Sequence, residues 1–316
     1  MANRVGRFGR VALMGPPNAG KSTLLNALLG QKVTIVTPLP QTTRNQIVGI
    51  LTDEGVQAVF MDTPGLTQIR GRLGKSMTRA VWESLRQADV IMLVLDGNLY
   101  ARRPEFLERD LAPVAEALAN DARPMIVVIN KVDLLGDKSR MLPLFTKMYD
   151  LWPKAEIFPL SALLGDGLPD LKALLSSVLP EGMQQFPDEQ ISTLPVRFMA
   201  AEIIREKLFL HLRQEVPYNV AVEMESWKES EERGQIVAHA VVYVTKSTHK
   251  AMVIGQRGSM IKRIGMEARK DIQALLERKV YLELWVKVRE NWAEDPFLLQ
   301  DAALLQGTLY DGGTIA

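Results

Sequence analysis

The sequence predicts an α/β domain with a mostly parallel sheet, followed by a smaller α+β domain. Short β-branched apolar runs alternate with longer amphipathic stretches up to about residue 180, and the order of segments changes after residue 195. The length of 316 residues also exceeds the roughly 150 residues of an average domain. Two domains of different architecture are therefore expected.

The composition excludes several classes of protein. With 47% hydrophobic and 24% charged residues the chain can build sizeable cores, so global disorder is excluded. The absence of cysteine excludes disulfides, thiolate metal sites and cysteine nucleophiles, and it fits a reducing compartment. The three histidines, His211, His239 and His249, lack the spacing of a zincin. We expect a soluble protein, because no signal peptide is recognisable and no apolar run approaches roughly 18 residues.

The elements of the first domain follow from its periodicity. Brief apolar runs that end in turn residues or carboxylates predict buried strands at 10–15, 57–62, 89–96, 125–130 and 155–160. Apolar residues at three-to-four spacing predict helices at 22–30, 71–87, 103–120, 138–152 and 167–180. Strands that alternate with helices indicate a parallel sheet covered on both faces.

The second part of the chain has a different order of elements. We expect helices at 197–214 and 259–278 and strands at 219–229, 235–246 and 280–288. The stretch before them is rich in Pro, Gly, Gln and acidic residues and shows no strong periodicity. The expected organisation is a first domain over 1–180, a linker over 181–194, a second domain over 195–292 and a tail over 293–316.

A phosphate-binding loop follows the first strand. The run GPPNAGKS matches G-x-x-x-x-G-K-[ST] between a predicted strand and a predicted helix. Its glycines allow backbone N–H groups to surround a phosphate at a helix N-terminus, Lys21 reaches the β and γ phosphates, and Ser22 binds magnesium. A simple glycine turn is the alternative, but it would not need the lysine. The expected contacts are Gly15, Pro16, Pro17, Asn18, Ala19, Gly20, Lys21, Ser22 and Thr23.

A second carboxylate is needed to hold the magnesium shell, and the motif DTPG supplies it at the end of the strand 57–62. We expect Asp62 to hold the metal and the Gly65 N–H to reach the γ-phosphate, a contact that is lost on hydrolysis. Thr63 and Pro64 complete the motif.

The base-binding motif is NKVD, at the end of the strand 125–130. Guanine offers two adjacent donors that a carboxylate accepts and adenine does not, so Asp133 predicts GTP rather than ATP. Asn130 is expected to contact the guanine edge and to brace the loop, and the Lys131 stem is expected to cover the ring. After the next strand, the Ala162 N–H is expected to donate to the guanine carbonyl, within the run Ser161, Ala162 and Leu163.

These motifs together resemble the translation-factor class of Ras-like GTPases, which implies a magnesium-dependent GTP hydrolase. The resemblance places the effector loop on Gln41, Thr42, Thr43, Arg44 and Asn45. The magnesium-contacting threonine falls on Thr42 or Thr43, and the sequence leaves both open; a structural role in the loop is the alternative. Leu66 stands where Ras-type enzymes carry their water-positioning glutamine, so slow intrinsic hydrolysis is expected. In similar GTPases the asparagine at the position of Asn18 recruits a potassium ion, which we take as a hypothesis.

The net charge of +1 hides a local excess of basic residues. Between 246 and 270 a single acid, Glu267, is set against Lys246, Lys250, Arg257, Lys262, Arg263, Arg269 and Lys270. This stretch contains a G-x-x-G loop, made of Gly255, Gln256, Arg257 and Gly258, which opens the helix 259–278. KH domains use such a loop to clamp a nucleic-acid backbone. An ordinary solvated helix face is the alternative.

The strand 280–288 alternates in character, with Tyr281, Glu283, Trp285 and Lys287 on one face and Val280, Leu282, Leu284, Val286 and Val288 on the other. Trp285 beside Lys287 offers a platform for stacked bases. Packing under a helix or the tail is the alternative. The expected RNA-binding residues are Gly255, Gln256, Arg257, Gly258, Lys262, Arg263, Trp285 and Lys287.

The order helix-strand-strand-helix-strand resembles a type II KH domain, and its union with the GTPase motifs resembles the Era family over about 8–292. The resemblance implies binding to the 3′ end of small-subunit ribosomal RNA, a GTP-dependent switch in assembly of the small ribosomal subunit, and a cytoplasmic monomer attached peripherally to the inner membrane. A tRNA-modifying relative is excluded by the missing cysteine, and a tandem GTPase by the missing second phosphate loop. An RNA-binding or membrane-docking module with a vestigial nucleotide site is the remaining alternative.

Overall fold

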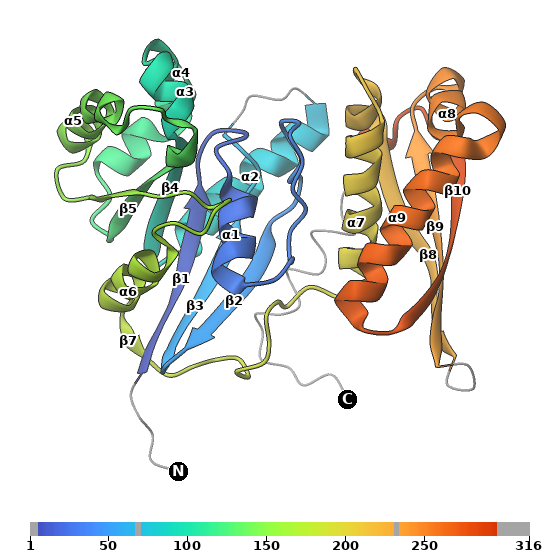
Figure 1. Ribbon diagram of the computed structural model, residues 1–316, viewed down its shortest axis with the longest axis horizontal. Helices are drawn as coiled ribbons and strands as arrows, with labels where there is room; N and C mark the ends of the chain where they lie inside the picture. The colour runs from blue at the N-terminus through green and yellow to red at the C-terminus, as the bar shows by residue number, and fades with distance from the viewer. Residues whose placement is uncertain (1–5, 67–70, 231–233, 296–316) are drawn as a thin grey trace. The chain divides into compact units, whose positions relative to one another are not determined.

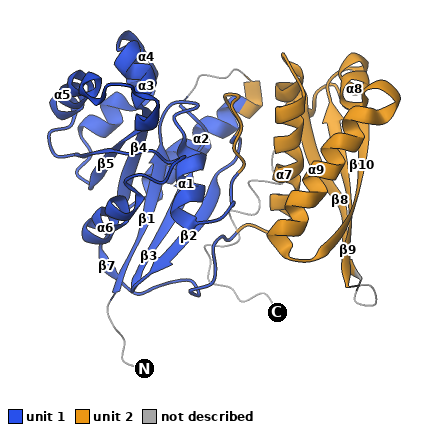
Figure 2. Cartoon of the chain, viewed as in Figure 1, with its two compact units in different colours: residues 1–34, 43–69, 74–193 blue, residues 35–42, 70–73, 194–316 orange. Residues whose placement is uncertain are grey.

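The computed structural model describes residues 6–66, 71–230 and 234–295. The chain divides into two compact units (Figure 2). The first comprises residues 1–34, 43–69 and 74–193, and the second comprises residues 35–42, 70–73 and 194–316.

The first unit is built on a mostly parallel sheet with the strand order β2-β3-β1-β4-β5-β6 (Figure 1). Only β2 runs antiparallel within this order, beside β3, and the short β7 pairs with β1. The strands are β1 Gly6–Met14, β2 Ile47–Asp53, β3 Val56–Asp62, β4 Val90–Asp96, β5 Met125–Asn130, β6 Glu156–Pro159 and β7 Glu181–Gly182. Because β1, β3, β4 and β5 are parallel, their carboxyl ends meet at one edge of the sheet.

Helices cover both faces of this sheet because its strands are apolar on both sides. The core on one face contains residues of α1 Lys21–Leu29 and α6 Leu168–Val178. The core on the other face contains residues of α2 Gly71–Gln87, α3 Gly97–Arg102, α4 Glu105–Ala119 and α5 Leu142–Leu151. Two 3-10 turns, η1 Val132–Leu134 and η2 Lys138–Met141, lie between β5 and α5.

The stretch predicted as a linker packs against the first unit. The Gln57 side chain accepts hydrogen bonds from the Gln185 and Phe186 N–H groups, at 2.8 and 3.0 Å. The Ile50 N–H donates to the Ile191 carbonyl oxygen, at 2.9 Å. These contacts satisfy polar groups along β2 and β3, so the stretch is an ordered part of the first unit up to Thr193.

The second unit packs helices against a three-stranded sheet with the order β10-β9-β8. Apolar residues of α7, α9 and the three strands form its core. Its elements are α7 Val196–His211, η3 Val216–Asn219, β8 Val220–Ser230, β9 Gln235–Val244, α8 Ser247–Ile254, η4 Gln256–Gly258, α9 Ser259–Leu276, β10 Lys279–Val288 and η5 Trp292–Glu294.

Within the described residues, the prediction left out four strands and helices, of which only α3, β7 and α8 are shorter than the helices that were predicted or the strands beside them. The sequence analysis missed β2, the helix α3, the two-residue β7 and the helix α8, which lies before the G-x-x-G loop. Eight residues, among them the β-branched Thr248 and Val253, are too few for a clear helical periodicity. Val288 was expected to point inward but is 42% exposed at the end of β10. Most of the predicted tail, 296–316, lies outside the described residues.

In the described part of the chain, none of the helices combines the length and the apolar character needed to span a bilayer.

Candidate functional site

The phosphate loop joins β1 to α1, and two of its glycines are required by the geometry. Gly15 has φ 141, and a Cβ there would lie 2.1 Å from the Val94 carbonyl oxygen. Gly20 has φ 94, and a Cβ there would lie 2.3 Å from the Asn130 Nδ2. Both backbones therefore approach their neighbours too closely for any side chain.

Lys21 is buried inside this loop. Its Nζ donates to the carbonyl oxygens of Gly15 and Pro16, at 2.8 and 2.9 Å. Burial lowers the pKa of Lys21 to about 8, while the nearby charge of Asp62 opposes this shift. The lysine is thus held at the start of the loop, where a phosphate is its natural counter-charge.

Oxygen atoms gather around Asp62 at the end of β3. The Ser22 hydroxyl donates to Asp62 Oδ2 at 2.7 Å, the Thr34 hydroxyl lies 3.3 Å from the same oxygen, and Thr43 Oγ1 lies 3.0 Å from Ser22 Oγ. Asp62 Oδ1 is buried and has no hydrogen-bond partner among the described residues. Burial raises the pKa of Asp62 to about 6, although the Lys21 charge acts in the opposite direction. Hard oxygen donors around a buried carboxylate fit a magnesium ion.

The two effector-loop threonines differ in their contacts. Thr43 lies beside Ser22, as described above. Thr42 Oγ1 lies 2.5 Å from Thr37 Oγ1 and donates to the Leu39 carbonyl oxygen at 2.8 Å. The structure therefore brings Thr43, and not Thr42, to the oxygen cluster around Asp62.

The hydrogen bonds described above for the oxygen cluster involve none of the other effector-loop residues, Gln41, Arg44 and Asn45. Gln41 has a positive φ of 62. Arg44 is buried, and Asn45 is partly buried.

The DTPG turn packs directly on the phosphate loop. A Cβ at Gly65 would lie 2.8 Å from the Pro17 Cα, so only glycine fits there. The Leu66 N–H donates to the Gly15 carbonyl oxygen at 3.1 Å, and the Thr63 hydroxyl donates to the Leu13 carbonyl oxygen at 2.9 Å. Pro64 stands between these two anchored residues.

Asn130 connects three loops at the predicted base site. Its Oδ1 accepts from the Lys131 and Ala162 N–H groups, at 2.8 and 2.9 Å, and its Nδ2 donates to the Ala19 carbonyl oxygen at 2.9 Å. The Ala162 N–H was expected to donate to a guanine carbonyl. In the structure it donates to Asn130 Oδ1 instead. Asp133 Oδ1 is buried and without a partner among the described residues, which fits a carboxylate awaiting donors.

The loop after β6 places Ser161 and Leu163 differently. Ser161 is buried and its hydroxyl accepts from the Leu164 N–H at 3.2 Å. Leu163 is 76% exposed, so its side chain is available to cover a ligand.

Some contributors to this site escaped the sequence analysis. Thr34 was missed because no motif contains it, and Asn26, on α1, accepts from the Val33 and Thr34 N–H groups and so fixes their segment. Asp96 was also missed, although a carboxylate at the end of β4, in register with Asn130, was a signal that the sequence offered.

The G-x-x-G loop of the second unit has positive φ angles at both of its glycines. Gly255 has φ 73, and a Cβ there would lie 2.6 Å from the Met260 Cβ. Gly258 and Arg257 also have positive φ, of 77 and 51. Gln256 and Arg257 are exposed at the tip of this turn, so the loop presents polar side chains and backbone to solvent.

An apolar groove of about 250 Å³ lies between α9 and β10. Its lining consists of Ile261, Lys262, Gly265, Met266, Arg269, Leu282 and Leu284. Of these the sequence analysis named only Lys262 as a site residue, because a groove made by a helix and a strand that follows it has no sequence motif. Arg263 lies outside the lining and pairs with Glu267 at 3.1 Å.

Trp285 and Lys287 do not enter the groove. Side chains alternate along a strand, and Leu282 and Leu284 point into the groove, so Trp285 and Lys287 belong to the opposite face of β10. Trp285 is 56% exposed, and Lys287 forms an ion pair with Glu225 at 2.6 Å.

Comparisons with known proteins agree with both units. The family of 50S ribosome-binding GTPases matches residues 10–131, and the KH domain family matches residues 215–293. The chain is 70% identical over 299 residues to GTPase Era of Desulfovibrio desulfuricans, covering 95% of this chain and 97% of the relative. It is 43% identical over 301 residues to GTPase Era of Geobacter metallireducens, covering 95% and 99%.

Two solved structures are similar over almost the whole chain. One is an Era variant of Aquifex aeolicus bound to GDP and aluminium fluoride, with a TM-score of 0.84, 38% identity, and coverage of 93% of this chain and 98% of that one. The other is Era with MgGDPNP and nucleotides 1506–1542 of 16S ribosomal RNA, with a TM-score of 0.85 and the same identity and coverage. The predicted fold, a GTPase domain with a mostly parallel sheet followed by a KH domain, is confirmed.

Proposed function

Because the chain belongs to the GTPase Era family, a magnesium-dependent GTP hydrolase family, we propose that it binds small-subunit ribosomal RNA near its 3′ end and acts as a GTP-dependent switch in small-subunit assembly. The observation that carries the proposal is the apolar groove beside the G-x-x-G loop. The GTPase family that matches residues 10–131 is named for binding the large ribosomal subunit, but the match covers only that part of the chain. The relative that holds 16S RNA matches 93% of the chain, so we favour the small subunit.

The proposal assigns nucleotide binding to residues 1–180 and RNA binding to residues 195–292, joined by residues 181–194. In the first region Lys21 would neutralise the β and γ phosphates, and Ser22, Thr43 and Asp62 would hold Mg²⁺, which spreads the charge that develops on the phosphate oxygens. Asp133 would accept the two guanine donors. The anchored Gly65 turn would carry the γ-phosphate contact.

Leu66 cannot orient a water molecule through its side chain, which supports slow intrinsic hydrolysis. A potassium ion recruited by Asn18 would supply positive charge in its place. Hydrolysis rates in matched potassium and sodium buffers test this part of the proposal. A faster rate in potassium that is lost in Asn18→Ala supports it, and equal rates in the two buffers contradict it.

The RNA surface is argued from charge and shape together. The groove has an apolar floor of Ile261, Leu282 and Leu284, on which bases can stack or pack, and Lys262 and Arg269 line it with positive charge. Arg257, exposed in the G-x-x-G turn, adds a further charge for the backbone. Trp285 and Lys287 lie on the other face of β10, so they would contact RNA only as a second patch that is separate from this groove.

The experiment is a filter-binding titration with an RNA that carries the 3′ end of the small-subunit ribosomal RNA. Arg257→Ala and Lys262→Ala should each weaken binding and reduce the slope of log affinity against log salt by about 1. Lys154→Ala, an exposed lysine of the first unit, is the charge-matched control and should bind like the unaltered chain. Unchanged affinity in both Arg257→Ala and Lys262→Ala would contradict this surface.

A vestigial nucleotide site is the second candidate, and it predicts no preference among nucleotides. The buried oxygens Asp62 Oδ1 and Asp133 Oδ1, which have no partner among the described residues, argue against a vestigial site. Burying a carboxylate oxygen without a partner costs free energy, and a bound ligand would offset that cost. Competition between GTP and ATP for the purified chain distinguishes the two candidates, because only a functional base site should prefer GTP.

The location is proposed from the family resemblance. We place the chain in the cytoplasm as a monomer, with peripheral contact to the inner membrane. Sedimentation with and without vesicles of inner-membrane lipids measures both the oligomeric state and the contact.

A further inference from the structure

We propose that Asp96 is a positioning residue of the guanine-nucleotide site, and that it acts by holding Lys131 across the phosphate loop. The inference rests on the proposed nucleotide site of the first unit. It concerns a residue that lies outside the four GTPase motifs, at the end of β4 and in register with Asn130 of β5.

Both oxygens of the Asp96 carboxylate are engaged. Oδ1 accepts from the Leu99 N–H at 2.9 Å and thereby caps the helix α3, while Oδ2 accepts from the Lys131 Nζ at 2.6 Å. The cap fixes the orientation of the carboxylate, because an N-cap side chain must aim at the first turn of its helix. The oxygen that meets the lysine is therefore presented in one place.

Lys131 in turn bridges two loops. Its Nζ also donates to the Asn18 carbonyl oxygen in the phosphate loop, at 2.5 Å. Lys131 and Asn18 both have left-handed backbones, with φ 65 and φ 60; asparagine adopts this conformation fairly readily, whereas lysine needs contacts that hold it there. The chain of contacts from Asp96 through Lys131 to Asn18 supplies such a hold.

An ion pair between exposed side chains usually contributes little to stability, but this pair is largely shielded from solvent. The Lys131 and Asp96 side chains are only 28% and 15% exposed, and the ammonium is shared between a carboxylate and a carbonyl. A lysine stem has four rotatable bonds, and two fixed acceptors at its tip confine it. The pair therefore fixes the conformation of the Lys131 side chain and contributes little to the free energy of unfolding.

The consequence concerns nucleotide binding and not the hydrolytic step. The stem of Lys131 is the part proposed to cover the guanine ring, and Asn130 already ties the same loop to Ala19. Without Asp96 the ammonium keeps one carbonyl partner and the stem gains freedom. GDP and GTP should then dissociate faster by a similar factor, because both carry the same base.

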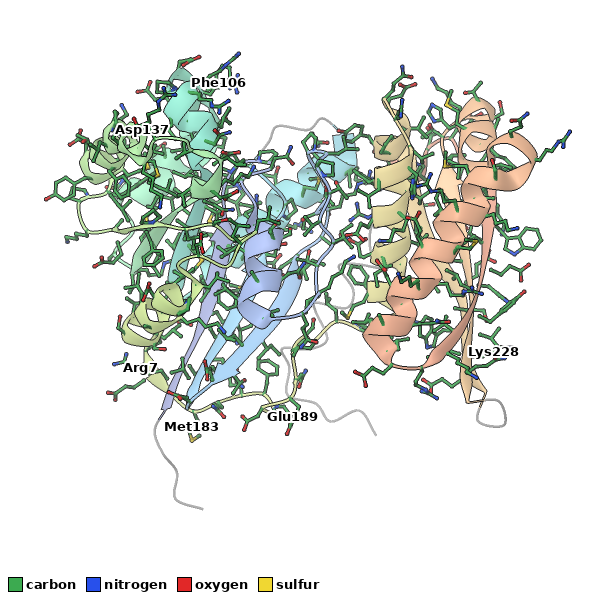
Figure 3. All side chains as sticks on the ribbon, viewed as in Figure 1. Arg7, Phe106, Asp137, Met183, Glu189 and Lys228 are labelled. Carbon is green, nitrogen blue, oxygen red and sulfur yellow. The ribbon has the colours of Figure 1, made fainter. Side chains whose placement is uncertain are left out.

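The main variant is Asp96→Asn, which keeps an oxygen for the α3 cap and removes the charge that holds Lys131. We expect the dissociation rate of a fluorescent GDP to rise about tenfold, a typical coupling for a contacting pair, while the single-turnover hydrolysis rate of pre-bound GTP stays within about twofold. Asp96→Glu restores the charge and should lie closer to the unaltered chain. The matched control is Asp137→Asn. Asp137, labelled in Figure 3, also caps a helical turn, through the Ser139 N–H, but it is not paired with Lys131. This substitution should change neither rate.

A double-mutant cycle separates positioning from a purely structural role. Lys131→Met keeps an apolar stem and removes the ammonium, so Asp96→Asn should have no further effect in that background. Additive effects of the two substitutions, or an unchanged dissociation rate in Asp96→Asn, would overturn the inference. Failure of the unaltered chain to bind guanine nucleotides would instead contradict the proposed function, so the two failures are distinguishable.

Discussion

Four of the proposed functional loops each contain a residue with a left-handed backbone, although Glu54, Gln214 and Glu277 show that such residues also occur elsewhere in the described part of the chain. Asn18 of the phosphate loop, Gln41 of the effector loop, Lys131 of the base loop and Arg257 of the G-x-x-G loop all have positive φ without being glycine. This conformation costs about 1–2 kcal/mol per residue. In the phosphate and base loops, named hydrogen bonds from Asn130 and Lys131 hold the shape, so the strain is balanced by contacts that form the site.

Asp62 should make metal binding depend on pH. Its pKa is raised to about 6 by burial, so the folded, metal-free chain binds this proton more tightly than the unfolded chain does. The stability contributed by the protonated form is present at low pH and is lost as the pH rises through about 6. Magnesium needs the carboxylate, so its apparent affinity should fall about tenfold per pH unit below about 6.

Magnesium titrations of nucleotide binding between pH 5 and 8 measure the affinity, and urea unfolding measures the stability. Asp62→Asn should remove the contribution of this carboxyl group to the pH dependence of both quantities. A magnesium affinity that stays constant down to pH 5 would show that Asp62 is already ionised there.

The two effector-loop threonines should respond differently to truncation. Thr43 Oγ1 lies 3.0 Å from Ser22 Oγ, so Thr43→Ala should raise the magnesium concentration needed for half-maximal GTP hydrolysis by about tenfold. Thr42 is bound to Thr37 and Leu39, so Thr42→Ala should leave that concentration within about twofold. A larger effect at Thr42 than at Thr43 would reverse the assignment.

At the scale of elements, the sequence predicted the helices and strands with a clear periodicity. It did not predict the short helix α8 or the groove that forms between two packed elements. The long helices and buried strands follow from periodicity, and the phosphate loop from the fixed spacing between Gly15 and Ser22. The helix α8 is eight residues long and gave no periodic signal. The groove was missed for another reason, because Gly265 and Leu284 face each other only after α9 packs on β10.

Gly265 gives a test that separates the stability of α9 from the function of the groove. A Cβ added there would meet Leu284 Cδ1 at 3.4 Å, an ordinary contact. Gly265→Ala should therefore increase the free energy of unfolding by about 0.5–1 kcal/mol, because alanine favours a helix interior. Gly265→Leu should fill the groove and weaken RNA binding by about tenfold, since a base loses its apolar floor. Denaturant unfolding and filter binding measure the two effects, and equal RNA affinity in Gly265→Leu would show that the groove is not used.

For the whole molecule, the loops that we expect to respond to nucleotide are divided between the two units. Residues 35–42 and 70–73 are part of the second unit, whereas Thr43 is part of the first. Within the second unit the Val36 N–H donates to Glu206 Oε1 of α7 at 3.1 Å, and the Arg72 N–H donates to Glu294 Oε1 at 3.2 Å. If Thr43 moves on hydrolysis, the movement would begin one peptide bond away from residues 35–42, the segment whose Val36 N–H donates to α7.

This arrangement predicts reciprocal coupling between nucleotide and RNA. If a GTP analogue with magnesium orders the loops around Thr43 and Gly65, it should raise RNA affinity over GDP by about 5–150-fold, and RNA must tighten the analogue by the same factor. Glu206→Ala removes the acceptor for Val36 and should bring both factors toward one, whereas Glu206→Gln keeps an acceptor oxygen and should preserve much of the coupling. The two factors are measured at fixed salt in the full chain, with unfolding curves to check that each variant is folded. Identical RNA affinities with analogue and GDP in the unaltered chain would refute the switch, while equal coupling in the unaltered chain and Glu206→Ala would refute only the part assigned to α7.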